Sequence, residues 1–138
     1  MQFGIVPLLV AAHLTSQAQN NFGWKDASGK TRNRSDLEEI LGKHNEWLRS
    51  GGKSGVRANL NRAILNRANL SYAELFYTIL SGANLNRANL SRADLSGADV
   101  AGADFTEADL EGTVLRGVKG FEAARGTDRA LNGDKAVR

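Results

Sequence analysis

The sequence lacks several features on which common kinds of protein depend. It contains no cysteine, so disulfide bonds and thiol chemistry are excluded, and the redox compartment stays open. It also has no residues at metal-ligand spacing, no glycine-rich phosphate loop and no pair of nucleophile and base. We therefore expect that the protein is not an enzyme and has no catalytic, cofactor-binding or metal-binding residues.

Long hydrophobic runs are missing as well. The most apolar stretch outside the middle of the chain, Phe3 to Leu14, is too short to cross a membrane. It fits an N-terminal extension, the apolar part of a secretory signal with Ser16-Gln17-Ala18 as a loose cleavage site, or a start site placed too far upstream. No lysine or arginine precedes it, which disfavours the signal. We expect a cytoplasmic protein, and secretion through a cleaved signal is the alternative.

The chain does contain a repeat of five residues that runs from Ala58 to Gly117. Its twelve units follow one another without a gap, and the third residue of every unit is large and apolar. Alanine fills the first position except at Thr78 and Thr113. A period of five matches neither a helix nor a flat strand, so the repeat predicts a coiled backbone whose first and third residues point inward. The third residues are Leu60, Leu65, Leu70, Leu75, Leu80, Leu85, Leu90, Leu95, Val100, Phe105, Leu110 and Leu115.

Unbroken tandem units of the form A(D/N)LXX resemble those of the pentapeptide repeat family. The resemblance covers less than half of the chain. It implies an all-β fold, a right-handed quadrilateral parallel β-helix with four five-residue sides to each coil, so that the repeat would form about three coils. Known members of the family include inhibitors of DNA gyrase that resemble DNA in shape and charge.

A stack of three short coils exposes apolar side chains and unpaired backbone groups at both ends, so it needs caps. The sequence from Ser35 to Glu38 fits a capping box, which predicts an amphipathic helix from about Asp36 to Arg49. We expect this helix to cap the first coil over Leu60, Leu65, Leu70 and Leu75. The apolar residues that would do so are Leu37, Ile40, Leu41, Trp47 and Leu48.

One polar side chain, His44, lies on the same face of the predicted helix. It has no acidic or second histidine neighbour, so we interpret it as a structural residue rather than a metal ligand or a base. At the other end of the stack, Val118 and Phe121 are the expected plug.

These features divide the chain into four parts. Residues 1–34 are an N-terminal extension, or a signal and linker, whose anchors Phe22 and Trp24 dock on the body of the protein. Residues 35–57 are the capping helix and a glycine-rich connector, and residues 58–117 are the repeat. Residues 118–138 are a C-terminal plug and a flexible tail, with at most a weak helix around Arg129 to Leu131.

The fifth residue of each unit lies furthest out, and residues one coil apart stack. This places Arg67 beneath Arg87, and Tyr72 beneath Arg92 in a cation–π contact. The first two coils are basic and the third is acidic, which predicts a gradient of charge along the stack. The residues of a candidate interaction surface are Arg62, Arg67, Arg87, Arg92, Tyr72, Phe76 and Tyr77.

The adjacent aromatic residues Phe76 and Tyr77 have two interpretations. They form an exposed patch that marks a partner site, or they are the place where Trp24 or the apolar N-terminus docks. We favour docking.

Three functions follow from these observations. We expect a non-enzymatic scaffold that binds another protein, of unknown identity. Nucleic-acid binding through the arginines of the first coils is the alternative, because they could meet phosphates. Inhibition or protection of DNA gyrase is less favoured, because mimicry of DNA needs a dominantly acidic rod and this repeat is close to neutral.

Overall fold

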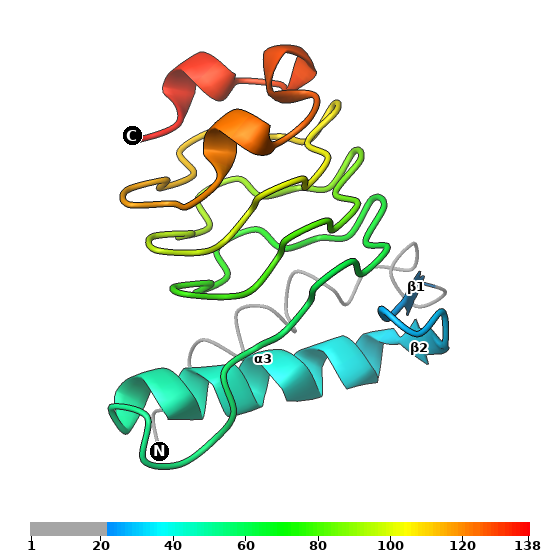
Figure 1. Ribbon diagram of the computed structural model, residues 1–138, viewed down its shortest axis with the longest axis vertical. Coiled ribbons are helices and arrows are strands. Elements are labelled where there is room, and N and C mark those ends of the chain that lie inside the picture. The colour runs from blue at the N-terminus through cyan, green and yellow to red at the C-terminus, as the bar shows by residue number, and fades with distance from the viewer. Residues whose placement is uncertain (1–21) are drawn as a thin grey trace.

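The computed structural model describes residues 22–138 and shows a stack of four-sided coils above one long helix (Figure 1). Parallel backbone bridges join residues twenty apart, as between Asn59 and Ile79 and between Ile64 and Asn84. Four such bridges, one on each side, link the first coil to the second. The period and the parallel stacking predicted for the repeat are therefore confirmed.

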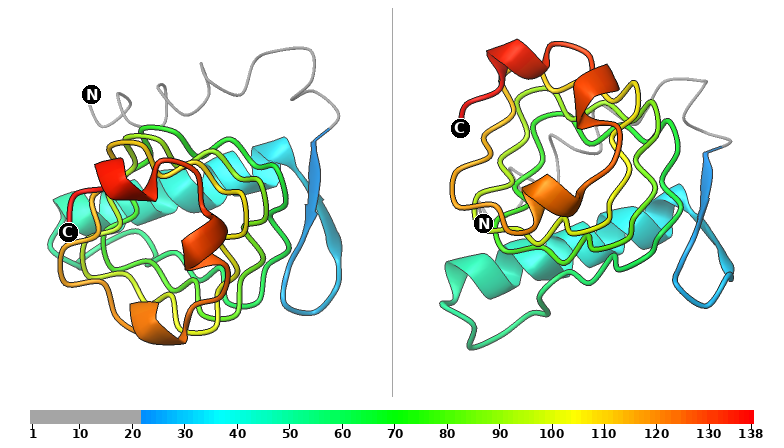
Figure 2. Two further views of the ribbon diagram at one scale, coloured as in Figure 1. Left: turned by 90° about the horizontal axis from the view of Figure 1, so that it is seen from above. Right: turned by 45° about the horizontal axis from the view of Figure 1, so that its top comes forward.

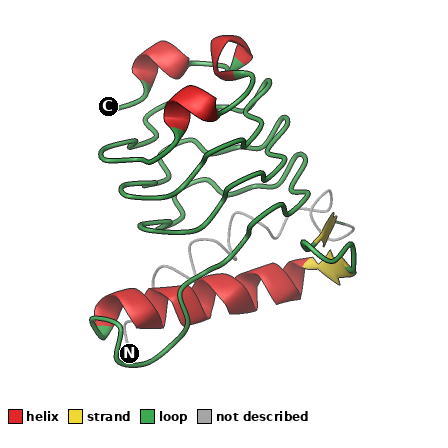
Figure 3. Ribbon diagram, in the orientation of Figure 1, coloured by secondary structure: helices red, strands yellow, loops and turns green. Residues whose placement is uncertain are grey.

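Each side of a coil contributes a single bridge rather than a long strand, so loops and turns dominate the repeat (Figure 3). The second residue of a unit makes both of its backbone hydrogen bonds with the coil below. Asn84, for example, donates its N–H to Ala63 at 2.8 Å and accepts from the N–H of Leu65 at 2.8 Å. A turn then closes each corner, where Ala68 donates to Leu65 at 3.0 Å.

The interior of the stack is apolar, as predicted. All twelve third residues of the units are buried, and so are the alanines of the first position. Thr78 and Thr113, which replace alanine, are also buried, and each hydroxyl has a partner. Thr113, for example, donates to the carbonyl of Leu90 at 2.7 Å, which satisfies a polar group that would otherwise be costly to bury.

The second residue of most units stabilises the corner that follows it. Asn84 accepts through its side chain from the N–H of Asn86 at 3.0 Å, and Asp104 does the same from Thr106 at 2.9 Å. The hydroxyl of Thr106 also donates to Asp104, and this bond, with the charge of Arg125 as a lesser cause, lowers the pKa of the Asp104 carboxyl. The Asn and Asp residues thus serve turn geometry, as expected.

The helix α3, Arg34–Arg49, crosses beneath the first coil (Figure 2). Leu37 and Leu41 are buried in the same core as the leucines of the repeat, and Ile40 packs partly against it. Trp47 and Leu48 are only half-buried, so they cover less than expected. No helix among residues 22–138 is long and apolar enough to cross a membrane.

The start of α3 corrects one prediction. The N-cap is Asn33, whose side chain accepts from the N–H of Asp36 at 3.0 Å, while the Asp36 carboxylate accepts from the N–H of Asn33 at 2.9 Å. The capping box therefore uses these two residues and not Ser35 with Glu38. The helix begins earlier because the strand before it delivers Asn33 in an extended conformation at the N-cap.

A β-hairpin replaces the expected linker before the helix. Strands β1, Gly23–Lys25, and β2, Thr31–Asn33, pair antiparallel, and Lys25 also bridges to Ile64 of the first coil. Trp24 is buried, and its indole N–H donates to the carbonyl of Asn33 at 3.0 Å. Phe22 packs partly against the core, so both aromatic anchors dock on the body of the protein as predicted.

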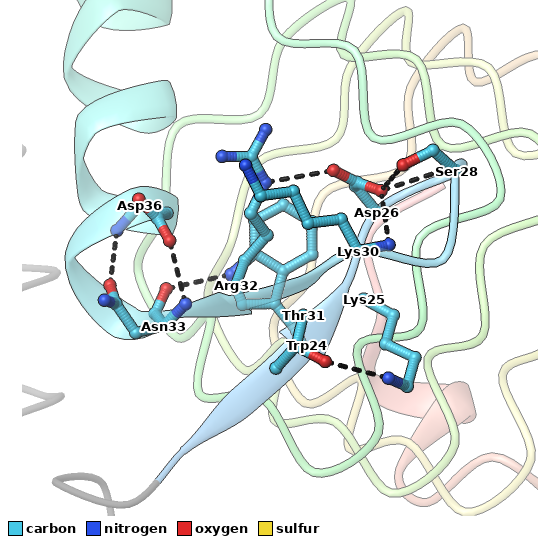
Figure 4. A network of polar contacts seen from close by, with 9 residues as sticks. All are labelled: Trp24, Lys25, Asp26, Ser28, Lys30, Thr31, Arg32, Asn33 and Asp36. Carbon is cyan, nitrogen blue, oxygen red and sulfur yellow. Dashed lines mark hydrogen bonds and ion pairs between the residues drawn. The ribbon is translucent and has the colours of Figure 1, made fainter.

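The turn of the hairpin is organised by Asp26 (Figure 4). Its carboxylate accepts from the hydroxyl of Ser28 at 2.6 Å, from the N–H of Lys30 at 3.0 Å and from the guanidinium of Arg32 at 3.0 Å. These bonds, that of the Ser28 hydroxyl first, lower the pKa of Asp26 to about 2.

The C-terminal segment forms a fourth coil, which corrects the prediction of a plug and a flexible tail. Bridges join Asp99 to Lys119, Asp104 to Arg125, Asp109 to Leu131 and Val114 to Val137. As predicted, Val118 and Phe121 pack against the core, with the Phe121 ring 6.1 Å from that of Phe105. The backbone groups on the upper edge of the third coil need partners, and this segment supplies them.

The fourth coil follows a period of six residues rather than five. Short 3₁₀ turns, η2 at Phe121–Ala123, η3 at Thr127–Arg129 and η4 at Gly133–Lys135, hold the extra residue at successive corners (Figure 2). Each turn follows a residue with positive φ, and each is followed by an alanine that packs against the core. In the sequence, this period appears as Gly120, Gly126 and Asn132 and as Ala124, Ala130 and Ala136.

Replacement of an inward leucine tests the core. We expect Leu85→Ala to lower the free energy of unfolding by about 2–5 kcal/mol, because a fully buried side chain leaves a cavity. Ile64→Ala is the matched control, since Ile64 is 44% exposed, and it should cost about 1 kcal/mol or less. Urea denaturation followed by circular dichroism measures both. Equal losses of unfolding free energy in the two variants would contradict the burial of the third residues of the units.

Two glycines test the fourth coil. Gly126 has a φ of +70°, and a Cβ there would lie 2.6 Å from the backbone nitrogen of Thr106. Gly126→Ala should therefore lower the free energy of unfolding by about 1–3 kcal/mol. A Cβ on Gly133 would meet nothing within 4 Å, so Gly133→Ala should change it by about 0.5 kcal/mol or less. If the two variants unfold at the same urea concentration, this segment does not pack on the third coil.

Candidate interaction surface

The fifth residue of every unit has a positive φ, and this fixes the geometry of the outer surface. Values run from 57° at Arg62 to 72° at Gly102. Glycine takes this conformation freely, whereas any other residue there costs roughly 1–2 kcal/mol. The side chains at these positions are therefore placed at the corners against a backbone preference.

Long side chains at the corners are concentrated in the first coils. All four corners of the first coil carry arginine or tyrosine, at Arg62, Arg67, Tyr72 and Tyr77. The second coil has Arg87 and Arg92 with two glycines, and the third has Glu107 with three glycines. Six of the seven predicted candidates are thus corner residues, and the seventh, Phe76, precedes the corner at Tyr77.

Residues at the same corner of successive coils form a column, and the column of Tyr72 and Arg92 makes the predicted contact. The guanidinium of Arg92 lies 5.9 Å from the centre of the Tyr72 ring and donates to its hydroxyl at 3.4 Å. This confirms the predicted cation–π pair. In the next column, Arg87 pairs with Glu107 at 2.6 Å, which offsets the repulsion between Arg87 and Arg67 beneath it.

Some corner side chains also cover a glycine of the next coil. A Cβ added to Gly97 would lie 2.5 Å from the ring of Tyr77, and one added to Gly82 would lie 2.9 Å from Cγ of Arg62. The glycines of the second coil therefore make room for the long side chains below them. The carbonyl of Tyr77 also accepts from the Nε of Arg57 at 2.6 Å.

The candidate residues do not form one patch, because successive corners point to different sides. Arg62 lies at one corner of the stack, and Phe76 and Tyr77 lie at another. The column of Arg67 and Arg87 and the column of Tyr72 and Arg92 border the same side of the stack. We call that side the arginine face; it comprises Arg67, Tyr72, Arg87 and Arg92 with the ladder of Asn69, Asn89 and Asp109 between them. Four of the seven predicted residues are thus brought together.

The arginine face has a hollow that reaches from the second coil to the fourth. A hollow of about 490 Å³ is lined by Arg87, Ala88, Asn89, Glu107, Asp109 and Leu131. Leu131 is 53% exposed, so this hollow offers both an apolar group and a charged pair. Sequence reasoning missed Leu131, because only the six-residue period shows that this residue continues the ladder of Asn89 and Asp109.

The aromatic residues Phe76 and Tyr77 are not covered by Trp24, because Trp24 lies near Leu60 and Ala63 instead. Tyr77 is 51% exposed and Phe76 is half-buried. The other predicted occupant, the apolar N-terminus from Phe3 to Leu14, lies outside the described residues.

The predicted gradient of charge holds within the repeat but does not continue into the fourth coil. The third coil is acidic, but the fourth coil carries five basic and three acidic residues. Lys119 stacks on Asp99 and Arg125 stacks on Asp104. The acidic coil thus lies between basic neighbours, and its charge is locally balanced.

His44 joins α3 to the first coil. It is fully buried, and its Nδ1 accepts from the N–H of Ala58 at 2.9 Å while its Nε2 lies 2.9 Å from the carbonyl of Phe76. A neutral ring with its proton on Nε2 satisfies both groups. Burial lowers the pKa of His44. This geometry agrees with the structural role predicted for it. Among residues 22–138, no group of three His, Asp or Glu side chains is placed to hold a metal ion.

Comparison with known proteins identifies the repeat. Residues 56–92 and 83–119 match the family described as pentapeptide repeats, with eight copies. Among solved structures, the chain is similar to a pentapeptide repeat protein (Rfr23) from the cyanobacterium Cyanothece 51142, at 32% identity and a TM-score of 0.39. That match covers 57% of this chain and 52% of the other, so the chain spans about half of its length. No curated protein matches the chain.

The pH dependence of stability tests the neutral state of His44. Because its pKa is lowered on folding, the stabilisation is complete above pH 6.5, the ordinary value, and is lost as the pH falls through the folded pKa. We expect the free energy of unfolding to fall below pH 6.5 by up to about 1.4 kcal/mol per pH unit for one proton. His44→Gln should flatten this slope.

The control is His13→Asn, which removes the other histidine and should keep the slope. Urea unfolding at a series of pH values measures all three proteins. A slope in His44→Gln equal to that of the parent would contradict the assignment.

Proposed function

We propose that the chain is a non-enzymatic scaffold that binds another protein through its arginine face, because residues 56–119 match the model of the pentapeptide repeats. Its coils then wind as the right-handed quadrilateral β-helix that the family implies. The observation that supports the proposal most is the set of arginines and tyrosines held at corners where glycine would cost less.

Backbone conformations that cost free energy are retained where the side chain is useful. Arg67, Arg87 and Arg92 lie at such corners on one side of the stack, together with Tyr72. Arginine and tyrosine are also the residues that contribute most at protein interfaces. A rigid face that presents both is therefore suited to a partner with an acidic surface.

The hollow beside Arg87 supports the same function. Its lining combines the exposed Leu131 with the Arg87–Glu107 pair, so an apolar side chain of the partner could be buried next to its acidic groups. Such a mixed site, with an apolar centre and a polar rim, is typical of protein interfaces.

Two other functions have less support. Only three arginines of the repeat share one face, and Arg87 among them is paired with Glu107, so a strand of nucleic acid would make few phosphate contacts and binding would be weak. DNA mimicry needs an extended acidic surface, whereas the acidic third coil lies beneath Lys119 and Arg125. We therefore expect no inhibition of DNA gyrase.

A photocrosslinking experiment tests the proposal. A photoreactive amino acid replaces Asn89, in the middle of the arginine face, or Ala101, on a different side of the stack, in the cells that produce the protein. We expect a protein adduct from the first position and none from the second. Arg67→Glu with Arg92→Glu should abolish that adduct, because both charges are reversed.

Arg49→Glu, a charge reversal at an exposed residue of α3, is the matched control and should keep the adduct. Equal adducts from Asn89 and Ala101 would contradict the proposed face. Binding to random-sequence DNA that falls steeply with salt would instead establish the nucleic-acid alternative.

A further inference from the structure

The lower edge of the first coil is paired with backbone at Ile64, whereas Asn59 and Glu74 have no backbone partner within residues 22–138. In the upper coils, the second residue of each unit exchanges backbone hydrogen bonds with the coil below. In the first coil, Ile64 makes these two bonds with Lys25 of the hairpin, at 2.8 Å and 3.3 Å. The equivalent N–H and C=O of Asn59 have no hydrogen-bond partner within residues 22–138. Among the described residues, Asn59 is therefore an unpaired strand edge.

This open edge forms the wall of a groove between the first coil, α3 and the hairpin. Two hollows of about 260 and 250 Å³ meet at Asn59. The first is lined by Ile40 and Lys43 of α3 and by Val56 and Arg57 of the connector. The second reaches past Leu60 to the turn of the hairpin.

The first hollow combines an exposed apolar side chain with positive charge. Val56 is 60% exposed, the highest value among the large exposed hydrophobic residues of the described chain. Lys43 pairs with Glu39 at 3.4 Å, but both side chains are more than half exposed, so the pair is weak. Arg57 lies on the other side of Val56 in the groove. An apolar group flanked by carboxylates complements this arrangement.

We propose that the groove binds an extended peptide segment of another protein, which adds a short strand beneath the first coil. The peptide exchanges its N–H and C=O with Asn59, as Lys25 does with Ile64 on the next side. One apolar residue of the peptide packs on Ile40 and Val56, and acidic residues next to it lie beside Lys43 and Arg57. Main-chain bonds then supply affinity, and the side-chain pocket supplies specificity.

This site is separate from the arginine face. It lies at the helix-capped end of the stack and uses none of the residues of that face, so either surface can fail its test without affecting the other.

The probe is the blocked peptide acetyl-Val-Asp-Val-Asp-Val-amide with a fluorophore, and the full chain is used. We expect saturable binding by fluorescence anisotropy. In amide NMR spectra, the shifted signals should centre on Val56 to Asn61. The same peptide with N-methyl groups on alternate residues cannot donate along one edge and should not bind.

Val56→Asp should weaken binding at least about tenfold, because it removes the apolar contact and adds a repelling charge. Leu131→Asp is the matched control at the other end of the stack, where Leu131 is 53% exposed, and it should bind like the parent. The proposal is overturned by absence of binding at about 1 mM peptide, by equal binding of the methylated peptide, or by shifts centred outside the groove.

Discussion

Backbone hydrogen bonding between successive coils is the interaction on which the rest of the structure depends. One coil by itself leaves its upper and lower edges unpaired, and a buried backbone group without a partner is costly. The inward leucines and alanines keep each coil the same size, so the edges of neighbouring coils meet in register. The corners preserve this register as well, because the positive φ at every fifth residue turns the chain at the same position in each coil.

The lower end of the stack meets this requirement with side chains as well as backbone. Lys25 pairs with Ile64 as a neighbouring coil would, and His44 supplies a donor to the carbonyl of Phe76 and an acceptor to the N–H of Ala58. A buried histidine on a helix thus takes the place of missing backbone groups. The helix contributes apolar cover at the same time, through Leu37 and Leu41.

Much of this fold could be predicted from the sequence, because the register of five residues is unbroken. The inward column, the turn role of Asn and Asp and the contact between Tyr72 and Arg92 all depend on that register alone. The hairpin and the helix start were missed, since short strands such as Gly23–Lys25 have no strong pattern and depend on Ile64 for pairing. The fourth coil was missed because its period changes from five to six. As a result, the candidate surface lacked Leu131, and the predicted gradient of charge omitted the basic fourth coil.

The six-residue period of the fourth coil also changes its perimeter. Each of its sides takes one more residue than a side of the repeat, and the 3₁₀ turns direct N–H groups such as those of Ala123, Arg129 and Lys135 to carbonyls of the same turn. A five-residue coil of a second molecule would therefore meet fewer free N–H groups along this edge. Open edges of regular stacks invite the addition of further chains. This edge is therefore a poorer template for a further regular coil than the edge of a five-residue coil.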